Sequence, residues 1–122
     1  MFDKELAREI LSQVLTAANR IERRSTGIGT PDDFLASDEG LDRLDAICMM
    51  LIAIGENLKN LDKITGGTLL TRYSEVDWKG AKGMRDIISH HYFDLNAEVV
   101  FTICRERLPC LIKAITKMKD EM

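Results

Sequence analysis

Apolar residues recur every three or four positions over most of the chain, which is the pattern of amphipathic helices. The first such stretch predicts a helix from Phe2 to about Arg24. Its apolar stripe is made up of Leu6, Ile10, Leu11, Val14, Leu15, Ala17, Ala18 and Ile21. Two glycines and a proline within 25–31 then predict a loop, and Pro31 to Leu35 a short helical turn.

A second helix is expected from an N-cap at Ser37 to about Leu61. Its apolar line runs through Leu41, Leu44, Cys48, Leu51, Gly55 and Leu58. The middle of this helix, residues 46–55, carries no charge on any face, so it must be covered on more than one side. The cover is either the centre of the bundle or a second protomer. Because Met49 and Met50 suit an interface, we favour a homodimer, with a packed core as the alternative.

The remaining chain predicts a loop with one short helix at 63–73 and a third main helix that starts near Asp77. Asp94 or Asn96 can cap a fourth helix from Ala97 to about Arg107. Pro109 bends or restarts this helix, which ends near residue 119. These elements predict an all-α fold in one domain over 1–122, an up-and-down four-helix bundle with an additional short C-terminal helical segment.

The composition narrows the class of protein. A chain of 122 residues with 45% apolar and 30% charged residues is typical of one soluble globular domain. The formal net charge of -3 provides no global positive field, so any RNA-binding surface must be local. The first residues lack the pattern of a secretory signal, and no apolar stretch is long enough to span a bilayer. The unpaired set Cys48, Cys104 and Cys110 indicates reduced core cysteines, and we expect a cytoplasmic protein without membrane contact.

Several chemistries are not expected. The glycines at 27 and 29 lack the third glycine of a dinucleotide loop, and Gly66-Gly67-Thr68 lacks the ending of a phosphate loop. The two histidines are adjacent and the cysteines are scattered, which argues against a zinc site. We therefore expect no metal and no cofactor.

The third helix carries both histidines of the chain, close after Arg85. Projected at about 100° per residue, its buried stripe is expected to consist of Ala81, Met84, Ile87 and Ile88. His91 falls inside this stripe and fits a structural core histidine. His90 falls outside it, with Asp86 one turn earlier, the spacing at which a carboxylate can hold an imidazole.

A local basic strip is predicted on the same helix, where Lys79, Lys82 and Arg85 project from the non-core surface. The alternatives are a solvated face without function and, for His90, a surface histidine without a role. Tyr92 lies almost on the same line as Arg85. Periodicity thus predicts a polar site and assigns it no activity.

The order Arg85, Asp86, His90, Tyr92 forms the pattern R-x4-H-x-Y and resembles the HepT-like branch of the HEPN superfamily. Two positions depart from the family's pattern. Asn57 stands where a small residue is common, and His91 fills the variable position before the tyrosine. The resemblance spans nearly the whole chain through Ile54-Gly55-Glu56, Trp78, Gly83-Met84, Tyr92-Phe93-Asp94 and Pro109-Cys110-Leu111.

The resemblance implies a metal-independent RNA endonuclease, the toxin partner of a minimal nucleotidyltransferase antitoxin that adds AMP to Tyr92. Arg85 and His90 would then be catalytic, Asp86 would orient His90, and Lys79 and Lys82 would bind RNA. A base, an acid and a cation suit such cleavage, and an imidazole can act as base or acid near neutral pH.

An ideal helix separates Arg85 from His90 by about 140°, and one protomer offers one outward histidine. A two-fold dimer would bring two motifs into one cleft, so we expect a composite site. Two other classes stay open: a non-catalytic helical module that binds a nucleotidyltransferase, and a structural dimer in which Arg85, Asp86 and His90 form only an ion network.

Overall fold

The computed structural model describes residues 2–90 and 96–122, and every regular element among them is helical. Of these, η1 and η2 are 3-10 turns and η4 is a π-helical turn. The prediction of an all-α protein is confirmed. In chain order the elements are α1 (Lys4–Ser25), η1 (Pro31–Phe34), α2 (Asp38–Ile64), η2 (Leu70–Arg72), α3 (Trp78–His90), α4 (Ala97–Thr102), η4 (Ile103–Arg107) and α5 (Leu108–Glu121).

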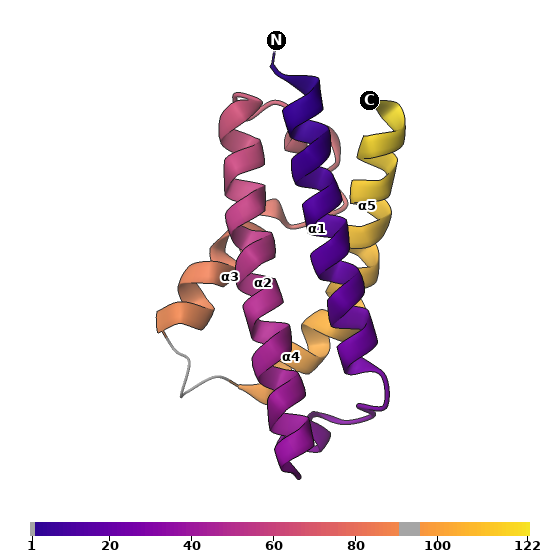
Figure 1. Cartoon of the computed structure of the whole chain (residues 1–122). Helices are drawn as coiled ribbons and strands as arrows, with labels where there is room; N and C mark the ends of the chain where they lie inside the picture. Colours follow the sequence, from indigo (N-terminus) through magenta and orange to yellow (C-terminus); the bar gives the residue numbers. More distant parts are fainter. Residues whose placement is uncertain (1, 91–95) are drawn as a thin grey trace.

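The two longest helices, α1 and α2, run antiparallel and side by side, and α5 lies along α1 (Figure 1). α3 packs mainly on α2, and a groove separates it from α4 and α5. The finer prediction of an up-and-down four-helix bundle therefore stays a prediction. The largest fully buried side chains are Leu11, Val14, Ile21, Phe34, Ile47, Leu51, Ile54, Leu58, Leu61, Leu108, Ile115 and Met118.

Side-chain caps set the predicted starts of two helices. Ser37 Oγ accepts a hydrogen bond from the backbone N–H of Gly40 at 3.0 Å. Asn96 Oδ1 accepts one from the backbone N–H of Glu98 at 2.8 Å. Both bonds satisfy donors that the first turn of a helix leaves without a partner. Ser37 and, of the two alternatives, Asn96 are thus confirmed as caps, while Asp94 lies outside the described residues.

The break predicted near Pro109 takes the form of a π turn. α4, η4 and α5 follow one another without a gap from Ala97 to Glu121. The backbone N–H of Leu108 bonds to the oxygen of Ile103, five residues earlier, which is the π pattern. Pro109 is the second residue of α5, directly after the π turn, so its missing N–H falls where the hydrogen-bond register changes. The continuation after proline is confirmed, and its last helix is longer than the predicted short segment.

Three residues predicted to face the core are exposed instead. Leu6 and Leu41 lie in the first turns of α1 and α2, where packing covers fewer faces, and are 41% and 40% exposed. Ile87 is 58% exposed. In the predicted stripe of the third helix only Ile88 is buried, because α3 has α2 as its main neighbour and its other apolar side faces the groove.

The three cysteines are free thiols, but they are not all in the core. Cys48 is buried as predicted, whereas Cys104 and Cys110 are half-buried. Burial raises the pKa of both Cys48 and Cys104 to about 11, so these thiols stay protonated and weakly reactive near neutral pH.

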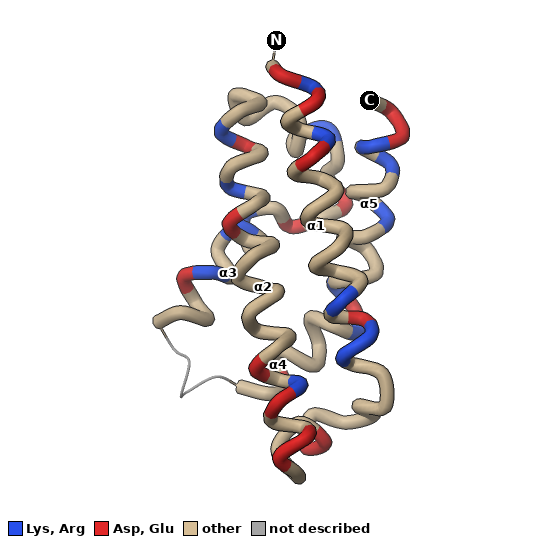
Figure 2. Tube along the Cα trace, in the orientation of Figure 1, with Lys and Arg blue, Asp and Glu red and all other residues tan. Residues whose placement is uncertain are grey.

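Charge is spread over the helices with both signs interleaved (Figure 2). This distribution agrees with the modest formal charge and with the expectation that any anion-binding surface is local. Within the described ranges no helix is long and apolar enough to cross a membrane.

Candidate functional site

A close approach between α2 and α3 places the candidate site. Gly55 is buried where the two helices meet. A Cβ atom at this position would lie 3.2 Å from the backbone nitrogen of Arg85 and 3.3 Å from the backbone oxygen of Ala81. Only a residue without a side chain lets the backbones come this near without a shift. The residue after Gly55 is therefore held beside Arg85.

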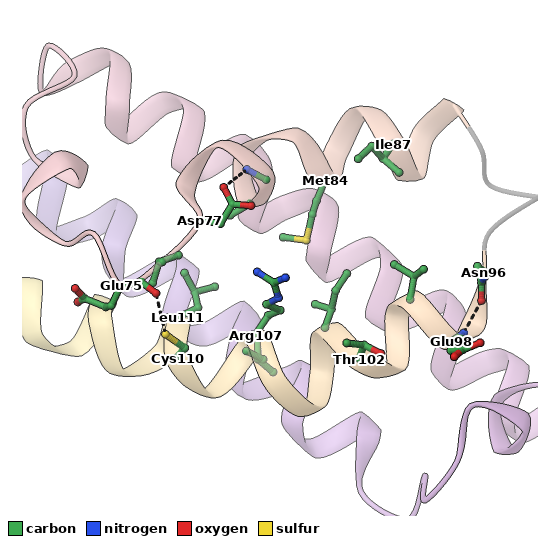
Figure 3. Close-up of a pocket in the computed structure, with 16 residues that line it drawn as sticks. Glu75, Asp77, Met84, Ile87, Asn96, Glu98, Thr102, Arg107, Cys110 and Leu111 are labelled. Carbon is green, nitrogen blue, oxygen red and sulfur yellow. Dashed lines mark hydrogen bonds between the residues drawn. The ribbon is translucent and has the colours of Figure 1, made fainter.

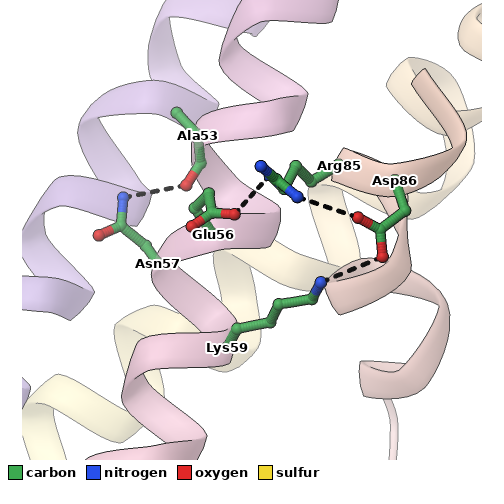
Figure 4. Close-up of polar contacts among 6 residues, drawn as sticks. All are labelled: Ala53, Glu56, Asn57, Lys59, Arg85 and Asp86. Atoms are coloured by element: carbon green, nitrogen blue, oxygen red, sulfur yellow. Dashed lines mark hydrogen bonds and ion pairs between the residues drawn. The ribbon is translucent and has the colours of Figure 1, made fainter. Parts of the chain in front are cut away.

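Four charged side chains form a chain of ion pairs across this contact (Figure 4). Glu56 Oε1 lies 2.6 Å from Arg85 Nε, and Arg85 Nη1 lies 3.1 Å from Asp86 Oδ1. Asp86 Oδ2 in turn lies 3.2 Å from Lys59 Nζ. All four side chains are between 40% and 49% exposed. We call Glu56, Lys59, Arg85 and Asp86 the Arg85 cluster; its formal charges sum to zero.

Asp86 does not have the partner that the sequence predicted. Its carboxylate contacts Lys59 and Arg85, and no hydrogen bond joins it to His90 in the described part of the chain. The hydrogen bond from Lys59, followed by the charge of Lys59 and the contacts of Arg85, lowers the pKa of Asp86. The physical reason is that a charged ammonium from α2 competes well for a carboxylate against an imidazole on the same helix.

Arg85 and His90 both lie at exposed positions of α3, and His90 is the last residue of that helix. The predicted exposure of His90 is confirmed. α3 itself starts as expected, because Asp77 Oδ1 accepts a hydrogen bond from the backbone N–H of Gly80 at 3.0 Å. Its entry is fixed further by Trp78, whose Nε1 donates to the backbone oxygen of Tyr73 at 2.7 Å.

The predicted basic strip is only partly available. Lys79 is exposed. Lys82 forms an ion pair with Asp62 of α2 at 2.8 Å, with both side chains 28% exposed. Since that carboxylate offsets the charge of Lys82, Lys79 is the freer of the two cations proposed to contact RNA.

Two predicted residues of the motif, His91 and Tyr92, lie outside the described residues. Conversely, sequence reasoning gave no role to Glu56 and did not single out Lys59. One signal pointed to them: both follow Gly55 on the second helix at spacings of one and four residues, so they flank a glycine suited to a close helix contact.

A groove of about 600 Å³ separates α3 from η4 and its neighbouring helices (Figure 3). Arg107 points into it between the two walls, and the exposed Ile87 and Val99 belong to its lining. Its other apolar lining residues are Val76, Ala81, Met84, Ile103, Leu108 and Leu111. Sequence periodicity did not reveal this groove, because Met84 and Ile87 have the spacing of core residues.

Acidic and metal-ligating side chains are distributed rather than clustered. In the part of the chain that the structure covers, no group of three or more His, Cys, Asp and Glu side chains could hold a metal ion. The polar chemistry at hand is thus that of a guanidinium held by carboxylates, an exposed imidazole and nearby lysines.

Residues 14–118 match the sequence model of a family described as Ribonuclease HepT-like. The match covers most of the chain and includes α2, α3 and the whole Arg85 cluster. The chain belongs to the HepT-like ribonuclease family.

Individual relatives agree with this class. "Putative RNase TTE0752" of Caldanaerobacter subterraneus subsp. tengcongensis is 31% identical over 111 residues, 91% of this chain and 92% of that protein. "Putative RNase MJ0127" of Methanocaldococcus jannaschii is 36% identical over 73 residues, 60% of this chain and 57% of its own length. "Gamma-glutamylcyclotransferase and putative RNase MJ0434" of the same organism is 29% identical over 112 residues, 92% of this chain but 47% of its own. No solved structure gives a significant match.

Proposed function

We propose that this protein is a metal-independent RNA endonuclease that acts as the toxin of a cytoplasmic toxin–antitoxin pair. The observation that carries the proposal is the family match, which spans Arg85 and His90 on the exposed side of α3. The names of the three relatives include RNase, which supports the same substrate class.

The chemistry uses the 2′-hydroxyl of RNA as the nucleophile. A base takes the proton of this hydroxyl, the 2′-oxygen bonds to phosphorus, and the bond from phosphorus to the 5′-oxygen breaks. An acid returns a proton to the 5′-oxygen, leaving a 2′,3′-cyclic phosphate and a 5′-hydroxyl. His90 is proposed for proton transfer and Arg85 for the charge at phosphorus, because a guanidinium matches phosphate oxygens and stabilises charge that develops in the transition state.

One imidazole cannot serve as acid and base in the same step, so we propose that two protomers share the cleft. The apolar middle of α2 supports this, since Met49 is 60% exposed there. A homodimer would bring Arg85 and His90 of both copies together. Lys79 and Lys82 are proposed to contact the RNA backbone, and Asp86 to act through Arg85 rather than through His90.

Control by a partner completes the proposal. A minimal nucleotidyltransferase antitoxin would transfer AMP from ATP to the hydroxyl of Tyr92 and release pyrophosphate, and the added anion would compete with RNA for the cation of Arg85. Intact-mass measurement after co-expression tests this step: AMP increments are expected on the wild type and none on Tyr92→Phe. The same increments on Tyr92→Phe would exclude Tyr92 as the acceptor.

One observation favours a second candidate function, a structural dimer in which the charges around Arg85 form only an ion network. Arg85 already has two carboxylate partners, Glu56 and Asp86, as a purely structural ion network would have. The two candidates differ in whether His90 is needed for turnover.

A nuclease assay on circular RNA in EDTA tests the proposal, because only an endonuclease opens a circle. The wild type should linearise the substrate and leave cyclic phosphate ends. His90→Ala should lower the rate about 100-fold or more, since positioned proton transfer contributes that much. Thermal melts would confirm that the variant is folded, as expected for an exposed residue at the end of α3. Equal cleavage by wild type and variant would reject catalysis by His90.

A further inference from the structure

We propose that Glu56 is the positioning residue for Arg85: it orients the guanidinium for the RNA phosphate and at the same time weakens the binding of that phosphate. The inference rests on the proposed RNA-cleaving function and deepens it, because it names the group that sets the geometry and the charge of the phosphate site.

The contact geometry leaves one part of the guanidinium for a ligand. Glu56 holds the inner nitrogen Nε at 2.6 Å, and Asp86 holds Nη1 at 3.1 Å. Among the described residues neither of these carboxylates nor any other group bonds to Nη2. Ion pairs to two of its three nitrogens favour one orientation of the planar group, and in that orientation Nη2 is left for a ligand.

The anchor of this arrangement is rigid. Glu56 directly follows Gly55, whose position allows the backbones of α2 and α3 to approach closely at Arg85. The close helix contact is allowed by that missing side chain, and other ion pairs between α2 and α3, such as that of Lys82 with Asp62, stay in place without the charge of Glu56. Since exposed ion pairs contribute little to stability, removing the charge of Glu56 should leave the fold intact.

The charges explain the opposite effects on binding and on turnover. Two cations and two carboxylates make the Arg85 cluster neutral, so the carboxylates offset part of the attraction between Arg85 and an incoming phosphate. Without the charge of Glu56 the cluster would carry one positive charge and bind RNA more tightly. The guanidinium would also be less firmly aligned, and misplacement of a charge-stabilising group slows the chemical step.

Two substitutions separate the effect of the charge of Glu56 from the effect of its side-chain length. Glu56→Gln keeps the length of the side chain and an oxygen acceptor but removes the charge. Glu56→Asp keeps the charge but is one methylene too short for the 2.6 Å contact. Glu39→Gln is the matched control: it removes the same charge from an ion pair with Arg43 on the same helix, about 25 Å away.

We expect Glu56→Gln to lower KM for RNA about two- to fivefold, the size of an exposed charge effect. Its kcat should fall about 10- to 100-fold. Glu56→Asp should lower kcat without lowering KM, and Glu39→Gln should match the wild type. Unchanged kcat and KM in Glu56→Gln would overturn the inference. So would a fall in kcat with a rise in KM and a lower melting temperature, the result expected of a structural ion pair.

Binding of a 2′-deoxy oligonucleotide, which cannot be cleaved by the 2′-hydroxyl route, supplies a readout independent of activity. Glu56→Gln should bind it about two- to fivefold more tightly than the wild type, and adding Arg85→Ala should abolish the gain. If the wild type does not cleave RNA, the proposed function fails, yet this measurement still decides on Glu56. Tighter binding that depends on Arg85 supports its influence on the phosphate site, and unchanged binding refutes it.

Discussion

At the scale of single residues, Tyr73 ties distant parts of the chain together. Its hydroxyl donates a hydrogen bond to the Glu121 carboxylate at the end of α5, and its backbone oxygen accepts from Trp78 at the start of α3. The ammonium of Lys117 lies 5.8 Å from the centre of its ring. The bond to Glu121, more than burial, raises the pKa of Tyr73 to about 12. Below its ordinary pKa of about 10, Tyr73 therefore supports the fold as a neutral donor.

Tyr73→Phe should lower the free energy of unfolding by about 1 kcal/mol at pH 8, the usual worth of one hydrogen bond. Because the folded pKa is raised, this contribution is complete below about pH 10 and is lost as pH rises through 12. Urea titrations at pH 8 and pH 11.5 should show the gap between wild type and variant closing. A gap of equal size at both pH values would contradict the assignment of the raised pKa to this bond.

The sequence predicted the exposure of His90 correctly but not the partner of Asp86. The exposed position of His90 followed from its angle on the helix, which periodicity fixes. The partner of Asp86 did not, because Lys59 lies 27 residues away in the chain and on another helix. Spacing rules connect residues of one helix, and the nearest such candidate, His90, was therefore predicted in place of Lys59.

At the scale of elements, the same logic explains why helix bounds were predictable. Periodic apolar positions and the caps at Ser37 and Asn96 placed the main helices within a few residues. The π turn Ile103–Arg107 was not predicted, because its hydrogen-bond register leaves no sequence pattern of its own. The groove beside α3 was missed for a related reason: periodicity identifies an apolar face without telling what covers it.

Two glycines give a sharp test of element packing. A Cβ atom at Gly40 would overlap the backbone oxygen of Asp33 and lie 2.9 Å from that of Phe34. Gly40→Ala should therefore destabilise the protein by about 1–3 kcal/mol, as overpacking does. Gly83 lies within α3 with nothing within 4 Å of such an atom, so Gly83→Ala should stabilise it by about 0.5–1 kcal/mol.

Denaturant melts of both variants measure these two effects on one scale. The informative result is that the same change from glycine to alanine lowers the free energy of unfolding at position 40 and raises it at position 83. Equal stability changes in the two variants would show that η1 does not pack against the start of α2 as described.

At the scale of the whole molecule, apolar surface remains without cover. Met49 on α2, Ile87 on α3 and Val99 on α4 are each more than half exposed. Such side chains are costly on a monomer when they are contiguous and are common at interfaces. The all-α class could be read from the sequence, but the exposure of these apolar residues could not, since periodicity carries no information on what covers a face.

A heterodimer of wild type and His90→Ala tests whether the cleft is shared. If one cleft needs the imidazoles of both copies as acid and base, a dimer with one His90→Ala copy should lose activity about 100-fold, because positioned proton transfer contributes that much. Differently tagged chains allow purification of the heterodimer before the assay. Verified heterodimers with about half of wild-type activity would contradict a shared cleft and leave each protomer to provide its own site.

The contact at Gly55 has a consequence for how such a sequence can diverge. A Cβ atom at position 55 would lie 3.2 Å from the backbone nitrogen of Arg85, so a side chain there would move α3 away by a few tenths of an ångström. Variation at position 55 is therefore coupled to the spacing between α2 and α3 at Ala81 and Arg85. Exposed positions such as Lys79 carry no such constraint. We therefore expect related sequences to vary at exposed positions while the close contact between α2 and α3 is kept.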